Sequence, residues 1–137
     1  MAASYELFSD GAARGNPGPA GAGALLRSQG GEVLAEISEY LGETTNNQAE
    51  YQALLLGLKK AQELKLTTLK VFLDSELVVK QLNGDYKVKH PDLIPLYREV
   101  VALLKKFPSI AVAHVYREKN KEADKLANLA IDSHFSK

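Results

Sequence analysis

The spacing of apolar residues changes near residue 45, and this change most limits the folds open to the chain. Before it, short apolar stretches are separated by glycine-containing turns such as residues 29–31, which is typical of antiparallel strands in hairpins. After it, apolar residues recur every three to four positions over residues 46–64, which predicts a helix. Strands and helices then alternate, which predicts parallel strands joined by right-handed crossovers. We therefore expect an α/β domain with one mixed five-stranded sheet and helices on its faces.

The same patterns give the bounds of the expected elements. Strands are expected at residues 5–10, 20–28, 32–41, 67–74 and 109–118. Helices are expected at residues 46–64, 75–82, 91–107 and 120–135. Pro95 falls in the first turn of its helix, where proline is tolerated, and Asn120 suits an N-cap. Periodicity alone does not fix the order of the strands in the sheet.

Length and composition narrow the class of protein. The chain has 137 residues and neither an internal repeat nor a linker, so we expect a single domain over residues 1–137. The absence of cysteine excludes disulfides and thiolate metal sites. Because 17 basic and 17 acidic residues cancel, any nucleic-acid binding must use a local basic patch. Without a segment typical of a signal peptide or a membrane span, we expect a cytoplasmic monomer that does not bind membranes.

Two predicted strands finish with the same pattern, an aromatic residue, one further residue and an aspartate. Phe8 precedes Asp10 in this way, and Phe72 precedes Asp74. Alternate residues of a strand share a face, and ligands of open α/β sheets bind at the carboxyl ends of the strands. If the two strands are parallel neighbours, both carboxylates project at the same edge. A simple turn at Asp10 is the alternative interpretation.

Two more acids lie on or beside the apolar faces of predicted helices. Glu50 precedes Leu54 by four residues, and Asp124 precedes Ala127 by three. Each acid alone could be a solvated flank or a favourable charge at a helix start. However, no lysine or arginine has an obvious place opposite all four, and buried acids are otherwise paired or bound to a metal. Carboxylates without histidine or cysteine suit a hard cation such as Mg²⁺ or Mn²⁺.

Four segments in succession resemble the motifs of the ribonuclease H type 1 family. They are SDGAARGNPGPAG at 9–21, TTNNQAEYQALLLGL at 44–58, VFLDSELVVKQLNG at 71–84 and NKEADKLANLA at 120–130. The resemblance implies a ribonuclease H fold with strand order 3-2-1-4-5, in which the first three strands are antiparallel. It also implies that the four acids Asp10, Glu50, Asp74 and Asp124 form the metal site of the family.

The resemblance further implies an activity, the metal-dependent hydrolysis of the RNA strand of RNA/DNA hybrids. The products would carry a 5′-phosphate and a 3′-hydroxyl. Two Mg²⁺ ions, with Mn²⁺ as a substitute, would serve the two ends of an in-line displacement. Asp10, Glu50 and Asp74 would hold one ion, and Asp10 with Asp124 the other.

Six residues would contact the substrate if the resemblance holds. They are Gly11, Asn16, Thr45, Asn46, Asn47 and Glu76. Short amide side chains near the metals can read the 2′-hydroxyl that distinguishes RNA from DNA. Thr45 and Asn46 also match a pocket for a phosphate of the DNA strand. The alternative is that these residues only cap the first helix, which is compatible with anion binding at a helix N-terminus.

The chain departs from the family in two places. Residues 83–93 replace an extra basic helix and loop, which leaves only Lys80, Tyr86, Lys87 and Lys89 as a basic surface and predicts weak, salt-sensitive binding. The family often places a histidine on the loop just before the last acid, whereas no histidine occupies the loop before Asp124. We expect Arg117, at the end of the last strand, to orient the scissile phosphate or to assist product release. A surface arginine is the alternative. His114 is expected to have a packing role within that strand.

Other functions fit the same predicted fold. A junction resolvase or an integrase-like core would share it, because a fold does not determine a function. A hybrid-binding module without catalysis and a structural domain are further alternatives. The segments TTNNQAE and GNPG favour ribonuclease H, and the complete set of acids favours catalysis.

Overall fold

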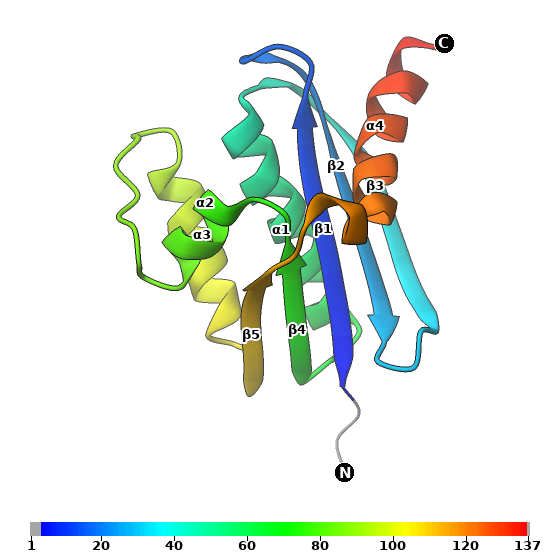
Figure 1. Ribbon diagram of the computed structural model, residues 1–137, viewed down its shortest axis with the longest axis vertical. Coiled ribbons are helices and arrows are strands. Elements are labelled where there is room, and N and C mark those ends of the chain that lie inside the picture. Colours follow the sequence, from blue (N-terminus) through cyan, green and yellow to red (C-terminus); the bar gives the residue numbers. More distant parts are fainter. Residues whose placement is uncertain (1–3, 137) are drawn as a thin grey trace.

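A five-stranded mixed sheet forms the centre of the computed structural model, which describes residues 4–136 (Figure 1). Residues 1–3 and 137, which the expected domain included, lie outside the described residues. The strands lie in the order β3-β2-β1-β4-β5, and β1 pairs antiparallel with β2 and parallel with β4. Their bounds are β1 Tyr5–Ala13, β2 Gly18–Ser28, β3 Val33–Thr44, β4 Thr68–Leu73 and β5 Ser109–His114. The expected fold class and strand order are confirmed.

Helices cover both faces of this sheet. Their bounds are α1 Asn46–Glu63, α2 Glu76–Leu82, α3 Ile94–Leu104 and α4 Lys121–Phe135. On β1, Leu7 belongs to the main core with α1, whereas the next residue, Phe8, packs against Ala123 of α4. Successive side chains of a strand point to opposite faces, so α1 and α4 cover opposite sides of the sheet. Helix α3 packs against α1.

The main core lies between the sheet and the layer formed by α1 and α3. Leu7, Leu54, Leu58, Val71 and Val100 are almost completely buried there. Complete burial of such a side chain stabilises the fold by about 1.5–3 kcal/mol relative to exposure. This core holds β1, β4 and α1 together, and these three elements carry Asp10, Asp74 and Glu50. No helix among residues 4–136 combines the length and apolar character needed to cross a membrane.

Three strands end at least three residues from the position that the sequence predicts. β3 extends to Thr44, past the expected residue 41. β1 continues three residues past Asp10 to Ala13, because β2 pairs with it up to Ala13↔Ala20. The last strand ends at His114 rather than at residue 118. Its partner β4 ends at Leu73, whose carbonyl accepts a final hydrogen bond from the Val115 amide at 2.9 Å. Beyond this bond the chain turns away into a 3-10 turn, Arg117–Lys119.

Candidate active site

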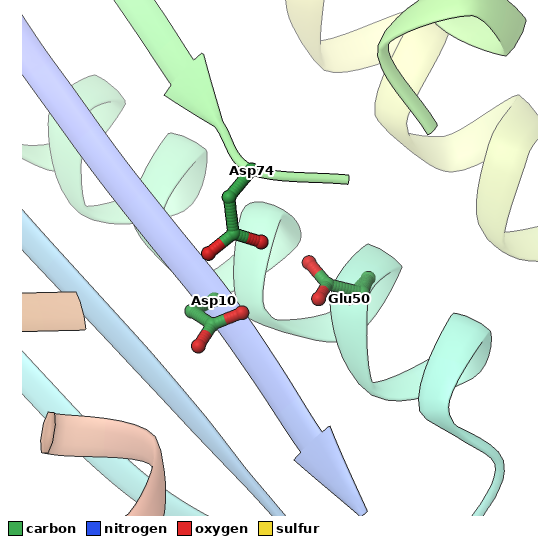
Figure 2. Close-up of side chains that lie close together, drawn as sticks. All are labelled: Asp10, Glu50 and Asp74. Carbon is green, nitrogen blue, oxygen red and sulfur yellow. The ribbon is translucent and has the colours of Figure 1, made fainter. Parts of the chain in front are cut away.

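The register between β1 and β4 brings Asp10 and Asp74 together. Ser9 and Leu73 form the last residue pair of this parallel ladder, and each aspartate follows one residue later. Asp10 therefore lies inside β1 but just past the end of β4. Figure 2 shows the carboxylates of Asp10 and Asp74 facing each other just past the end of β4. The expected adjacency of the two strands is confirmed.

Glu50 reaches the same point from helix α1. A Cβ on Gly11 would overlap the backbone of Ala49 and Glu50, so only glycine allows α1 to approach β1 this closely. The Glu50 side chain is buried, with 5% exposure, and points toward Asp10 and Asp74 (Figure 2). Gly11, expected to contact substrate, thus has an evident structural role as well.

Asp10, Glu50 and Asp74 form a compact cluster of carboxylates. One oxygen from each lies within 4.8 Å of the others. Burial, followed by the charge of Glu50, raises the pKa of Asp10 well above 3.8. Burial is likewise the main cause that raises the pKa of Glu50 above 4.5, although its hydrogen bond with Asp10 and the Gly11 amide oppose the shift. Glu50 Oε2 is buried and has no hydrogen-bond partner within residues 4–136. An all-oxygen set with an unpartnered buried oxygen fits a hard divalent cation.

Asp124 completes the expected four acids from the other face of the sheet. It lies on the first turns of α4, half-buried, and its interaction with Asp10 contributes to the raised pKa of Asp10. Asn128 Nδ2 donates to the carboxylate of Asp124 at 3.3 Å and to its backbone carbonyl at 3.0 Å. Asp124 is thus beside the three-carboxylate cluster rather than within it.

These acids line an open cleft of about 480 Å³. Its other walls include Arg14, Asn46, Arg117 and Asn128. No sequence pattern singled out Arg14 or Asn128. Arg14 Nη1 pairs with Asp132 at 2.7 Å and its Nη2 donates to Asn128 at 3.3 Å, which joins the β1–β2 hairpin to α4. The cleft therefore has acids at its base and arginine side chains on its rim.

The expected position of Arg117 is wrong, although the residue still lines the cleft. It lies in the 3-10 turn, not at a strand end, so strand alternation does not determine its direction. Its side chain is 80% exposed, and Nη2 lies 3.7 Å from Asp124 Oδ1. The packing role expected for His114 is also wrong, because His114 is exposed, and its ring meets the edge of Tyr116 with centroids 5.5 Å apart.

A second cavity of about 310 Å³ gathers most of the residues expected to bind substrate. Asn16, Thr45, Asn46 and Asn47 line it together with Gln48, His90 and Leu93. The Asn46 amide donates to Asn16 Oδ1 at 3.0 Å, and Asn46 also lines the acidic cleft. Glu76 is not among the residues that line either cavity. It is exposed and pairs with Lys80 at 3.0 Å.

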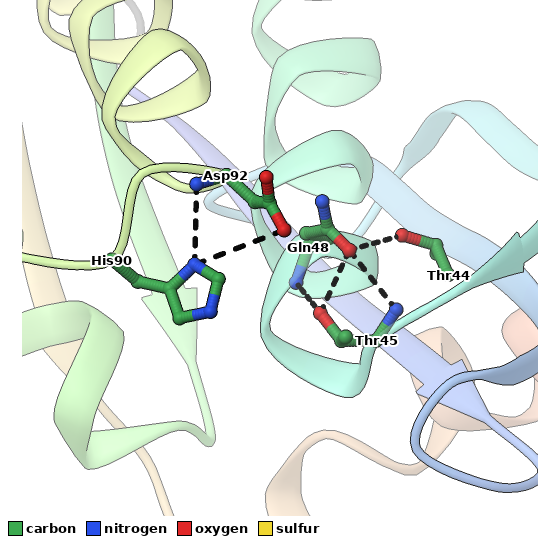
Figure 3. Close-up of polar contacts among 5 residues, drawn as sticks. All are labelled: Thr44, Thr45, Gln48, His90 and Asp92. Atoms are coloured by element: carbon green, nitrogen blue, oxygen red, sulfur yellow. Dashed lines mark hydrogen bonds and ion pairs between the residues drawn. The ribbon is translucent and has the colours of Figure 1, made fainter.

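Thr45 has the capping role that the sequence suggested. Its Oγ1 accepts the Gln48 amide at 3.2 Å, and Gln48 Oε1 in return accepts the Thr45 amide at 3.2 Å (Figure 3). Across the cavity, His90 Nδ1 accepts the Asp92 amide at 3.1 Å. The capping box fixes the start of α1, one turn before Glu50.

Asn120 is a site residue whose position the sequence did not reveal. It occupies the N-cap position of α4, but its side chain makes no capping hydrogen bond. Instead, Nδ2 donates to the Ser9 carbonyl at 3.0 Å and to Asp74 Oδ2 at 3.1 Å. Ser9 is 111 positions away in the sequence, and no local pattern indicates this contact.

The strand order and the acids at its centre define a ribonuclease H-like class of α/β protein. The Reverse transcriptase-like family matches residues 8–130. Among solved structures, RNase H1 from Halobacterium salinarum is 41% identical with a TM-score of 0.92, covering 95% of this chain and 98% of that chain. LC11-RNase H1, solved in complex with an RNA/DNA hybrid, is 42% identical with a TM-score of 0.91, covering 96% and 99%. The chain belongs to the ribonuclease H type 1 family.

A longer relative contains this unit as part of a larger protein. The bifunctional protein Rv2228c of Mycobacterium tuberculosis is 48% identical over 128 residues, which are 93% of this chain. The match spans 35% of the relative, so this chain corresponds to about a third of that protein's length.

Proposed function

We propose that this protein is an endoribonuclease that hydrolyses the RNA strand of RNA/DNA hybrids and leaves 5′-phosphate and 3′-hydroxyl ends. The observation that carries the proposal is the cluster of Asp10, Glu50 and Asp74 in an open cleft. It is supported by the 42% identity to LC11-RNase H1, whose structure holds an RNA/DNA hybrid. We further propose that residues 1–137 act as a single catalytic domain.

The four acids would hold two Mg²⁺ ions, with Mn²⁺ as a substitute. Asp10, Glu50 and Asp74 would bind one ion, and Asp10 with Asp124 the other. The cations would supply an activated water and would stabilise charge on the phosphate and the leaving oxygen. The protein's part is to hold four carboxylates at fixed positions on three rigid elements and on the start of α4. Without that support, like charges at this separation would move apart.

Arg117 would act on the phosphate from the rim of the cleft. Its guanidinium carries several donors in a planar fork that matches phosphate oxygens. Because the side chain is 80% exposed and 3.7 Å from Asp124, it is free to reach a phosphate held beside the acids. We assign it to orienting the scissile phosphate or to releasing the product phosphate.

Substrate choice would rest on the residues around the second cavity. Asn16, Asn46 and Asn47 offer amide groups that can bond a 2′-hydroxyl, the group that DNA lacks. Thr45 and Asn46, at the N-terminus of α1, would bind a phosphate of the DNA strand. Asn46 lines both cavities, so the two strands of one hybrid could be bound at once. Gly11 would face the substrate from the cleft, and Glu76 from the start of α2.

A basic surface formed by α2 and the segment between α2 and α3 would contact the hybrid backbone. Tyr86 and Lys87 line a further cavity of about 330 Å³ with Arg98, and Lys80 lies 5.1 Å from the Tyr86 ring centroid. Lys80 is already paired with Glu76, which reduces its value for phosphate binding. We also propose that the protein works as a monomer in the cytoplasm. The reducing conditions of that compartment are compatible with its lack of cysteine.

The test is a cleavage assay with purified protein. Labelled RNA/DNA hybrid, single-stranded RNA, double-stranded RNA, duplex DNA and branched DNA are incubated with Mg²⁺, with Mn²⁺ and with a chelator. We expect cuts only in the RNA of the hybrid and only with a divalent cation. Cleavage of branched DNA, or binding of the hybrid without cleavage, would instead favour a junction resolvase or a binding module.

A further inference from the structure

The side-chain contacts of Asn120 differ from those of a residue that only caps helix α4. An asparagine at an N-cap ordinarily accepts an amide proton from the first turn of the helix, and Asn120 does not. Its Oδ1 atom is also buried without a hydrogen-bond partner among the described residues. Buried polar atoms without partners are rare because they are unfavourable. Both features disfavour a purely structural role.

The orientation of the Asn120 amide is fixed by its surroundings. The Ser9 carbonyl and the Asp74 carboxylate can only accept hydrogen bonds, so the nitrogen must face them. The residue is 1% exposed, which leaves the side chain no alternative position in solvent. Asn120 Nδ2 therefore joins the backbone beside Asp10 to the side chain of Asp74.

Asn120 also contacts the fourth acid through its backbone. The Asp124 amide donates to the Asn120 carbonyl at 3.1 Å, in the first turn of α4. One residue thus connects the segments that carry Asp10, Asp74 and Asp124. A donor on one oxygen of a metal-binding carboxylate fixes its direction, and such supporting contacts strongly influence metal affinity.

We propose that Asn120 is a positioning residue that aligns Asp74 and Asp124 with Asp10 and thereby sets the divalent-cation affinity of the site. This inference rests on the proposed function, because it assumes that these acids bind the cation. Asn120 itself touches neither the cation nor the substrate in this assignment. It acts by holding three acid-bearing segments in one arrangement.

The experiment measures cation binding without requiring cleavage. Mn²⁺ is titrated into wild-type, Asn120→Ser and Asn120→Ala proteins, and free Mn²⁺ is followed by electron paramagnetic resonance. We expect both variants to bind Mn²⁺ about 10- to 100-fold more weakly than wild type. Hybrid affinity in a chelator should be unchanged, because phosphate contacts do not involve Asn120. Serine is a good N-cap, so Asn120→Ser should melt at a higher temperature than Asn120→Ala while losing as much Mn²⁺ affinity.

Two control variants separate positioning from loss of stability. Val100→Ala removes volume from the core under α3, away from the acids, and should lower the melting temperature without changing Mn²⁺ affinity. Asn83→Ser removes a side-chain amide hydrogen bond of the same kind, from Asn83 Nδ2 to the Val112 carbonyl at 3.2 Å. This variant should also leave Mn²⁺ affinity unchanged. If the Asn120 variants melt early but bind Mn²⁺ like wild type, the residue is structural and the inference is wrong.

The wild-type protein provides a measurement that needs no variant to fold. In nitrogen-15 spectra, the side-chain amide of Asn120 should shift as Mg²⁺ is added, whereas that of Asn83 should not. An Asn120 signal that stays constant at saturating Mg²⁺ would overturn the inference. The two proposals can fail separately. Wild-type protein whose Mn²⁺ affinity depends on Asn120 but that cuts no hybrid refutes the function, and active protein whose Asn120 variants bind Mn²⁺ like wild type refutes the positioning role.

Discussion

Phe8 of β1 and Phe72 of β4 lie directly opposite each other in the parallel pair, and their rings stack with centroids 4.9 Å apart. Asp10 and Asp74 follow these phenylalanines by two residues each, so their side chains lie at the same level, just past the end of β4. Glu50 meets them from α1, and one oxygen of each acid lies within 4.8 Å of the others. The rigid stack thus holds like charges together, and a bound cation would relieve their repulsion.

Replacing Asp10 should separate catalysis from stability. Asp10→Asn is expected to abolish cleavage of the hybrid, because Asp10 would bind both ions. The same change should raise the melting temperature of the metal-free protein at neutral pH, since a buried asparagine is neutral at every pH, whereas Asp10 must either carry a charge beside Glu50 and Asp74 or take up a proton on folding. The measurements are a cleavage assay with Mg²⁺ and thermal melts in a chelator. Near-wild-type turnover of this variant would contradict the two-metal assignment.

The raised pKa values of Asp10 and Glu50 predict how stability depends on pH. The unfolded chain releases these protons near pH 3.8 and 4.5, whereas the folded protein retains them to higher pH. Above pH 4.5 the folded state therefore binds more protons than the unfolded chain, until the folded protein releases them too. Over that pH range the free energy of unfolding falls as pH rises, by up to about 1.4 kcal/mol per pH unit for each extra proton.

Urea unfolding in a chelator should accordingly show a smaller free energy of unfolding at pH 8 than at pH 5. Saturating Mg²⁺ should remove this decline, because the cation binds the ionised carboxylates of the native state. The control is Asp10→Asn, in which the decline should be smaller. Metal-free protein that becomes more stable between pH 5 and pH 8 would contradict the prediction.

The sequence was sufficient to predict the features set by local periodicity. Strand alternation placed Phe8 with Asp10 and Phe72 with Asp74, and helical spacing placed Glu50 on a buried face, as the structure confirms. The strand order came from the resemblance to a family, since no local pattern specifies which strands are neighbours.

The predictions that were wrong concern features that depend on contacts between residues distant in the sequence. The last strand ends at His114 because its partner β4 ends at Leu73, and no property of residues 115–118 reveals where a partner stops. Arg117 was misplaced for this reason. Asn120 was interpreted as a cap because the same amide suits a helix start and a contact with Asp74, and only the fold distinguishes them.

Gly11 should tolerate no side chain. In Gly11→Ala the new methyl group would overlap the backbone of Ala49 and Glu50, which must then shift away from β1. We expect a loss of about 1–3 kcal/mol in the free energy of unfolding, together with weaker Mn²⁺ binding because Glu50 moves. Gly30→Ala is the matched control, since a Cβ there meets only Ser28 Oγ at 3.8 Å. Equal stability of the two variants in urea would show that the overlap relaxes without effect.

The short segment between α2 and α3 predicts weak and salt-dependent binding of the hybrid. Residues 83–93 contain no helix, and Lys80 is paired with Glu76, so few cations remain for phosphates. Affinity should fall steeply between low and physiological salt as counterions compete. A basic segment grafted in place of residues 83–90 should tighten binding more than it raises the maximal rate. Tight binding by the native protein at high salt would mean that another surface supplies the contacts.

Arg117 is expected to act on the rate rather than on the fold. Its side chain is 80% exposed, and its contact with Asp124 at 3.7 Å is a surface ion pair, which contributes little to stability. Arg117→Ala should therefore melt like wild type but cleave ~10- to 1,000-fold more slowly, with a smaller change in hybrid affinity. Arg117→Lys should recover part of the rate, because an ammonium keeps the charge but not the planar fork of donors. Steady-state kinetics with Mg²⁺ separate the two effects. His114→Ala is the control, since His114 is also exposed and its replacement should affect neither stability nor rate. If Arg117→Ala cleaves normally while a folded His114→Ala protein is inactive, the histidine at the end of β5 has the role that we assign to the arginine.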